Sequence, residues 1–86
     1  MYSIELSQRS QKFLEKLDDH IRKRIEDRLI NLGETSIPSD TKFICRDMGD
    51  KVFRYHIGDY RVLYKVKERE EIILIAKIDK RGRVYD

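Results

Sequence analysis

Residues 52–66 read Val-Phe-Arg-Tyr-His-Ile-Gly-Asp-Tyr-Arg-Val-Leu-Tyr-Lys-Val, and this stretch decides the fold. Apolar and polar side chains alternate on both sides of the central Gly-Asp pair, which predicts two β-strands at 52–57 and 60–66. A two-residue loop that begins with glycine favours a type II′ hairpin turn. Such a loop places His56 opposite Arg61.

The alternation divides this hairpin into two faces. One face is apolar and is expected to pack on the core; it carries Phe53, Tyr55, Ile57, Tyr60, Val62, Tyr64 and Val66. The other face collects Arg54, His56, Arg61 and Lys65, with Val52 and Leu63 between them. A third strand at 71–78 is expected to repeat the division, with Ile72, Leu74, Ala76 and Ile78 on one side and Lys77 and Asp79 on the other.

The N-terminal half follows a helical pattern. Residues 2–6 alternate as a short strand, and Ser7 suits the N-cap of a helix. Apolar residues then recur at helical spacing at Leu14, Leu17, Ile21, Ile25, Leu29 and Leu32, with Phe13 and Ile30 widening the stripe. Residues 8–32 form one helix or two; we favour two packed as a hairpin, because Asp18 or Asp19 could cap the second. Gly33 suits the C′ position, and a loop is expected at 34–41.

The fold class that follows is α+β. We expect a single domain at 1–86, built from a short N-terminal strand, a helical hairpin and a three- to four-stranded antiparallel sheet. Cys45 is the only cysteine, so no internal disulfide can form, and the histidines show no zinc-ligand spacing. The longest apolar run, at 72–76, is too short to span a membrane, and the N-terminus lacks a secretory signal. We therefore expect a cytoplasmic protein without a metal or cofactor.

The charge of the chain is uneven. The net charge is +3, but residues 1–50 hold nine Lys and Arg against ten Asp and Glu, whereas residues 51–86 hold ten against six. A basic sheet face suits a phosphodiester backbone, because arginine binds phosphate in a bidentate manner. On charge pattern alone, plain binding of a nucleic acid or an acidic protein is favoured over nuclease activity.

The segment Gly58-Asp59-Tyr60-Arg61-Val62-Leu63-Tyr64 resembles the Tyr-Arg strand of the RelE/ParE toxin family. Members of that family carry a basic strand, a glycine-containing turn, this Tyr-Arg strand, an apolar strand and a short basic tail that ends near a tyrosine. The chain follows that order over its whole length. The resemblance implies a RelE-like fold, similar to that of small microbial ribonucleases.

The resemblance also implies a function. A RelE-type toxin of a type II toxin–antitoxin system is an mRNA interferase: it binds the ribosomal A site and cleaves the mRNA there, inhibiting translation. In this chemistry the ribose 2′-hydroxyl attacks the adjacent phosphate, and no metal is needed. The implied partners are a cognate RelB-like antitoxin, in a heterodimer or heterotetramer, and the ribosome with its mRNA.

Residue roles carried over by position follow the same resemblance. Arg61 is expected to bind the scissile phosphate, and Arg81 to stabilise the transition state. Tyr85 is expected to stack on or orient the substrate, and Arg54 to aid proton transfer. The other cations expected to bind RNA are Lys51, Lys65, Lys77, Lys80 and Arg83.

Two positions depart from the family pattern. Val52 stands where RelE has the earlier of two lysines, and Lys51 beside it points to the other face of the strand. His56 stands where relatives often have arginine. Histidine can accept a proton near neutral pH, whereas arginine cannot, so we hypothesise that His56 assists the base step. A positioning role without proton transfer is the alternative.

Two other functions remain open at this point. The ParE branch shares the Tyr-Arg strand but inhibits DNA gyrase and cuts no RNA. The order of Arg81 followed by Tyr85 favours RelE over that branch. A non-catalytic module that binds RNA or an antitoxin is the second alternative, because the chain lacks a lysine at Val52.

Overall fold

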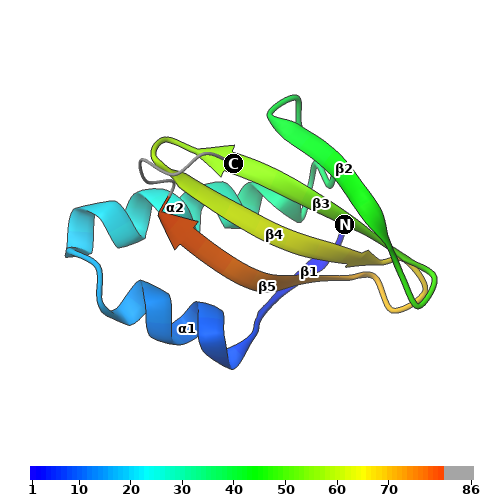
Figure 1. Ribbon diagram of the computed structural model, residues 1–86, viewed down its shortest axis with the longest axis horizontal. Coiled ribbons are helices and arrows are strands. Elements are labelled where there is room, and N and C mark those ends of the chain that lie inside the picture. Colours follow the sequence, from blue (N-terminus) through cyan, green and yellow to red (C-terminus); the bar gives the residue numbers. More distant parts are fainter. Residues whose placement is uncertain (81–86) are drawn as a thin grey trace.

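The computed structural model describes residues 1–80, which form a layer of sheet with helices on one side (Figure 1). In chain order the elements are β1 (Ser3–Leu6), α1 (Gln8–Glu15), α2 (Asp19–Leu32), β2 (Thr41–Asp47), β3 (Asp50–Ile57), β4 (Tyr60–Lys67) and β5 (Ile72–Lys80). The strands lie side by side in the order β1-β5-β4-β3-β2. β1 runs parallel to β5, and the other neighbours are antiparallel. The predicted α+β class is confirmed.

The helical segment divides into two helices, as predicted. Ser7 caps α1, because its side chain accepts a hydrogen bond of 3.1 Å from the backbone N–H of Ser10. Asp18 takes the N-cap position of α2. Gly33 is the C-cap of α2, with an ordinary helical φ of −62°, and not the C′ residue that the sequence suggests. Glycine is needed there because a Cβ would lie 2.8 Å from the backbone oxygen of Tyr2.

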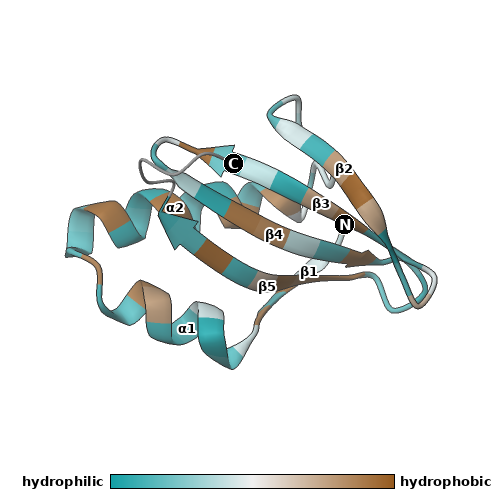
Figure 2. Ribbon diagram, in the orientation of Figure 1, coloured by the Kyte–Doolittle hydropathy of each residue, from teal (hydrophilic) through white to brown (hydrophobic). Residues whose placement is uncertain are grey.

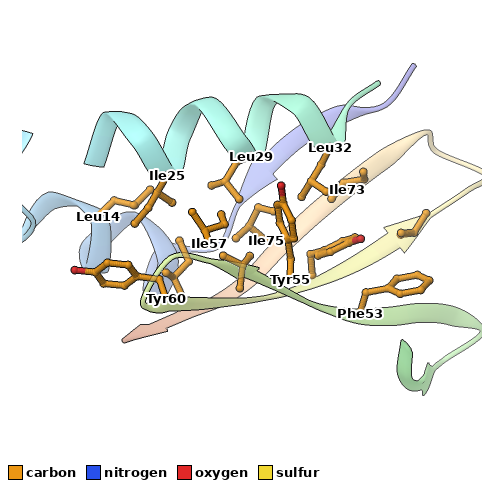
Figure 3. Close-up of a cluster of buried hydrophobic side chains, with 14 residues drawn as sticks. Leu14, Ile25, Leu29, Leu32, Phe53, Tyr55, Ile57, Tyr60, Ile73 and Ile75 are labelled. Atoms are coloured by element: carbon orange, nitrogen blue, oxygen red, sulfur yellow. The ribbon is translucent and has the colours of Figure 1, made fainter. Parts of the chain in front are cut away.

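The core lies between the helices and the sheet (Figure 3). Helix α2 contributes Ile25, Leu29 and Leu32, which lie above the strands in this view. The predicted apolar face of the β3–β4 hairpin is buried along its whole length, from Phe53 to Val66. Ile30 departs from the predicted stripe, because 64% of it is exposed. One step beyond Leu29 rotates a side chain by about 100° around the helix, away from the sheet.

The β3–β4 hairpin has the predicted register, with His56 opposite Arg61. Gly58 has a φ of +58°, as the first position of a type II′ turn requires. Helix α2 also reaches this turn, because a Cβ on Gly58 would lie 2.8 Å from Nη2 of Arg24. The positive φ therefore favours glycine at this position, whereas the Arg24 guanidinium is the end of a flexible, exposed side chain that can move aside.

Strand β2, at the edge of the sheet, was not predicted. It pairs with β3 through a hairpin whose turn has Met48 at φ +53° and Gly49 at φ +90°, the two positive values of a type I′ turn. Methionine rarely adopts a positive φ, so the residue types at 48 and 49 do not predict this turn. Phe43 packs edge-on against Phe53, with ring centroids 5.7 Å apart. The antiparallel part of the sheet therefore has four strands, the larger of the two predicted numbers.

Strand β5 contains a β-bulge. Ile75 pairs with Tyr64 and Lys77 pairs with Leu63, so Ala76 is an extra residue on β5. An extra residue shifts the alternation of side chains by one position. The expectation that a single alternation holds along the whole strand is therefore wrong.

The bulge decides which side chains of β5 face the core. The buried isoleucines are Ile73, Ile75 and Ile78. Leu74 pairs with Lys65 and lies on the opposite side of the sheet, contrary to the expectation for Leu74. The shift keeps Ile78 in the core and Lys77 out of it, because an unpaired charge in the core would cost several kcal/mol.

Candidate nucleic-acid interface

The outer face of the sheet is the side that the helices leave uncovered, with α2 lying behind the strands in Figure 1. Hydrophilic and hydrophobic residues alternate along the central strands, as Figure 2 shows. By strand pairing, the outer face carries Val52, Arg54 and His56 from β3, Arg61, Leu63 and Lys65 from β4, and Leu74, Lys77 and Asp79 from β5. The predicted basic face therefore exists, with apolar residues between its charges.

A hollow of about 220 Å³ lies on the outer face. It is lined by Ile44, Arg54, Arg61, Leu63, Lys77 and Asp79. Its three cations come from three adjacent strands, so the register of the sheet fixes their spacing. Because neighbouring strands lie about 4.8 Å apart, an anion above β4 is within reach of side chains from β3 and β5.

Arg54 has a donor that suits an anion. Its Nε atom is buried and makes no hydrogen bond within residues 1–80. A buried donor without an acceptor destabilises the fold by about 1–3 kcal/mol. The Arg54 side chain lines the hollow, where its guanidinium could donate a charge-assisted hydrogen bond to a phosphate oxygen. The arrangement therefore favours an anionic ligand over an empty site.

The lysines of the outer face have acidic neighbours. Nζ of Lys65 lies 2.6 Å from Oδ2 of Asp47, and this hydrogen bond raises the pKa of the Lys65 ammonium above its usual value. Nζ of Lys77 lies 3.3 Å from Oδ2 of Asp79. Part of the positive charge of each lysine is thus balanced by a carboxylate.

The predicted site residues divide into groups. Arg54, His56 and Arg61 lie together on neighbouring strands, with Lys77 lining the same hollow as the two arginines. Lys65 also lies on the outer face. The predictions for Arg81, Arg83 and Tyr85 fall outside the described residues.

Two predicted RNA-binding lysines lie elsewhere. Lys51 pairs with Val66 and follows the helix-side alternation of β3, one step out of phase with Arg54. It lines a separate hollow that includes Glu68. Lys80 pairs with the buried Tyr60, so it also follows the helix-side alternation. The structure does not bring either lysine to the hollow of Arg54.

One lining residue has no counterpart in the sequence prediction. Ile44 belongs to β2, which was not predicted, and the register shift between Phe43 and Cys45 places it at the hollow. The run Phe43-Ile44-Cys45 before a Met-Gly pair was the available signal for a strand there. With Leu63, it gives the hollow an apolar wall.

Within residues 1–80 no three His, Cys, Asp or Glu side chains come together as a possible metal site. Over the same described range, neither helix is long and apolar enough to cross a membrane.

Comparisons with known proteins place this geometry in a family. The model of the family described as the ParE toxin of the type II toxin–antitoxin system parDE matches residues 4–85. RelE1 of Methanocaldococcus jannaschii, named as a candidate toxin, is 33% identical over 85 residues, which cover 98% of this chain and 94% of that protein.

Solved structures agree with this result. The archaeal RelE–RelB complex from Pyrococcus horikoshii superposes with a TM-score of 0.84 at 28% identity, covering 96% of this chain and 98% of that one. The isolated Escherichia coli RelE toxin superposes with a TM-score of 0.78 at 21% identity, covering 98% and 88%, and supports the fold alone. The chain therefore belongs to the RelE/ParE family of toxins of type II toxin–antitoxin systems.

Proposed function

We propose that this toxin is a ribosome-dependent endoribonuclease that cleaves mRNA at the outer face of its sheet. The observation that carries the proposal is the hollow that Arg54, Arg61 and Lys77 line together, with one cation from each of three adjacent strands. Similarity to proteins named RelE supports this branch of the family over gyrase inhibition.

The proposed reaction begins with the ribose 2′-hydroxyl next to the scissile phosphate. Its oxygen attacks phosphorus as a base removes its proton, and the bond to the 5′-oxygen of the next nucleotide breaks as that oxygen takes up a proton from an acid or from water. The products are a 2′,3′-cyclic phosphate and a free 5′-hydroxyl. The negative charge on the pentacovalent phosphate is largest in the transition state, so fixed cations that contact it there accelerate the reaction.

The side chains of the outer face have distinct parts in this proposal. Arg61 binds the scissile phosphate, and Arg54 donates from its guanidinium to a phosphate oxygen and supports proton transfer. His56, opposite Arg61 in the hairpin, is suited to accept the 2′-hydroxyl proton, because imidazole gains and loses a proton near neutral pH. By resemblance to the family, Arg81 stabilises the transition state and Tyr85 stacks on a base.

A RelB-like antitoxin is the proposed inhibitor. The Pyrococcus horikoshii structure is a complex of RelE with RelB, and a similar complex is known from Mycobacterium tuberculosis. We expect the antitoxin to cover the basic outer face or to displace the segment that carries Tyr85. Co-expression with the small gene next to the toxin gene should then relieve growth arrest; arrest that persists would argue against that pairing.

Primer extension on an mRNA in a translation extract tests the proposal. Wild type should give discrete cuts within codons, and Arg61→Ala and Tyr85→Phe should weaken them. Arg28→Ala is the matched control, because it removes the same charge from an exposed position on α2. Inhibition of gyrase supercoiling without RNA cuts would instead identify ParE-like activity. RNA binding without either effect would identify a non-catalytic module.

A further inference from the structure

The β5 bulge is attached to the start of α1 through two serine hydroxyls. Oγ of Ser10 lies 2.9 Å from the carbonyl oxygen of Ile75, and Oγ of Ser7 lies 2.9 Å from that of Ala76. The backbone N–H of Ser7 also donates to the Ile75 carbonyl at 3.0 Å. These contacts join residues that are more than sixty positions apart in the sequence.

Ser10 is a fully buried polar residue, with no exposed surface. The two hydroxyl oxygens are 3.0 Å apart, and each carries a single proton. If both protons point at β5, both carbonyls are satisfied, while Oγ of Ser7 still accepts the capping bond from the Ser10 N–H. The pair thus caps the helix and holds the bulge.

The bulge determines which side chains of β5 line the hollow of Arg54 and Arg61. A strand that continued the alternation of Ile73 and Ile75 without an extra residue would turn Lys77 and Asp79 toward the core. With Ala76 inserted, Lys77 lies opposite Leu63 and Asp79 opposite Arg61 on the outer face.

We propose that Ser7 and Ser10 are positioning residues for the outer face: their hydroxyls fix the β5 bulge, which places Lys77 and Asp79 beside Arg61. This inference rests on the proposed ribonuclease activity for its kinetic consequence. Its effect on the backbone of β5 does not depend on that activity. Neither serine contacts RNA in this proposal, since both lie on the helix side of the sheet.

Substitutions at Ser7 separate its role as helix cap from its hydrogen bond to the bulge. Ser7→Thr keeps an acceptor for the cap and a donor for the Ala76 carbonyl. Ser7→Asp keeps the cap, because aspartate is an equally good N-cap residue, but its carboxylate cannot donate to a carbonyl. Gln8→Glu adds the same negative charge to the neighbouring exposed position and leaves both hydroxyls intact.

The kinetic test is single-turnover cleavage of ribosome-bound mRNA at saturating toxin. Ser7→Thr and Gln8→Glu should stay within about twofold of wild type, whereas Ser7→Asp and Ser10→Ala should fall by about tenfold or more, because small displacements of catalytic groups slow reactions strongly. The concentration of toxin that gives half-maximal rate should change little. Rates for Ser7→Asp and Ser10→Ala equal to that of Ser7→Thr would overturn the proposal.

Hydrogen exchange of the backbone amides gives the second readout. Exchange at residues 76–79 should be faster in Ser7→Asp than in Ser7→Thr, while exchange in the β3–β4 hairpin stays the same. Unchanged exchange at 76–79 would also overturn the proposal. If wild type cuts no RNA, the proposed function fails, and the exchange experiment still decides whether the serines hold the bulge.

Discussion

The two faces of the β3–β4 hairpin come from alternate residues of the same stretch, yet their surroundings differ completely. Tyr55, Val62 and Tyr64 face the helices and are at most 4% exposed. Arg54, His56 and Arg61 point the other way and remain partly exposed. A step of one residue along the strand thus separates a side chain that packs from one that can bind a ligand.

Under the proposed function, stability and activity depend on different faces of this small domain. On the helix side, the buried Tyr64 has a hydrogen-bond partner, because its hydroxyl donates to the carbonyl of Ser36 at 2.6 Å. On the outer face, Nε of Arg54 has no acceptor within residues 1–80. Substitutions on one face should therefore change the free energy of unfolding, and those on the other should change catalysis.

The largest effect is expected for Arg54→Met. Loss of a donor to the transition state should lower the single-turnover rate of RNA cleavage by about 100- to 1000-fold. The free energy of unfolding should stay the same or rise by about 1 kcal/mol, because the substitution removes a buried unsatisfied donor and keeps an apolar stem. Urea denaturation and single-turnover assays measure both. A large loss of stability would contradict the division between the faces.

Leu29→Ala should show the opposite behaviour. Leu29 is 2% exposed and packs between α2 and the sheet, so its truncation should lower the free energy of unfolding by about 3 kcal/mol. The cleavage rate per folded molecule should remain within about twofold of wild type. A strong loss of that rate at a temperature where the variant is fully folded would contradict the division, because a core residue would then control catalysis.

Tyr64→Phe tests how the helix-side face contributes to the free energy of unfolding at high pH. Burial raises the pKa of Tyr64 to about 12, from an ordinary value near 10. The folded state holds the proton more tightly, so the stability is intact below pH 10 and declines by about 2 kcal/mol as the pH rises to 12. In the variant this decline should be absent, at the cost of about 1 kcal/mol at neutral pH for the lost hydrogen bond. Denaturation curves that fall in parallel for both proteins between pH 10 and 12 would contradict the assignment.

The smallest effect is expected for His56→Gln. If His56 accepts the 2′-hydroxyl proton, the variant should cleave about tenfold more slowly, and its cleavage rate should depend less on pH than that of wild type. Glutamine keeps a polar side chain of similar length but cannot take up the proton. Full cleavage with an unchanged pH profile would assign His56 a positioning role.

Much of the fold could be predicted from local patterns. The Gly58 turn fixed the register of the central hairpin, and Ser7 marked the start of the first helix, because both positions have strong residue preferences. Strand β2 escaped prediction, since it is exposed at the sheet edge and its turn places Met48 at positive φ. The β5 bulge was not predicted because no local pattern marks it; its carbonyls accept hydrogen bonds from Ser7 and Ser10, which are more than sixty positions away in the sequence.

The candidate site was likewise predictable only where local patterns determine it. Arg54, His56 and Arg61 follow from the alternation and register of one hairpin. The wall formed by Ile44 depends on the edge strand, and the place of Asp79 depends on the bulge, so neither role follows from a single local pattern. The position of Lys51 shows the limit of charge counting, because a cation next to a site in sequence can belong to the other face.

The most direct test of the central claim is cleavage of a ribosome-bound mRNA with a single 2′-deoxy nucleotide on the 5′ side of the mapped cut. Wild-type toxin should cut the all-ribose mRNA, leave a 2′,3′-cyclic phosphate at the new end, and fail to cut the 2′-deoxy mRNA at that position. Arg61→Ala should cut the all-ribose mRNA much more slowly than wild type, and Arg28→Ala should behave as wild type. Equal cutting of both RNAs by wild type would contradict attack by the 2′-hydroxyl, and full cutting by Arg61→Ala would remove the outer face as the catalytic site.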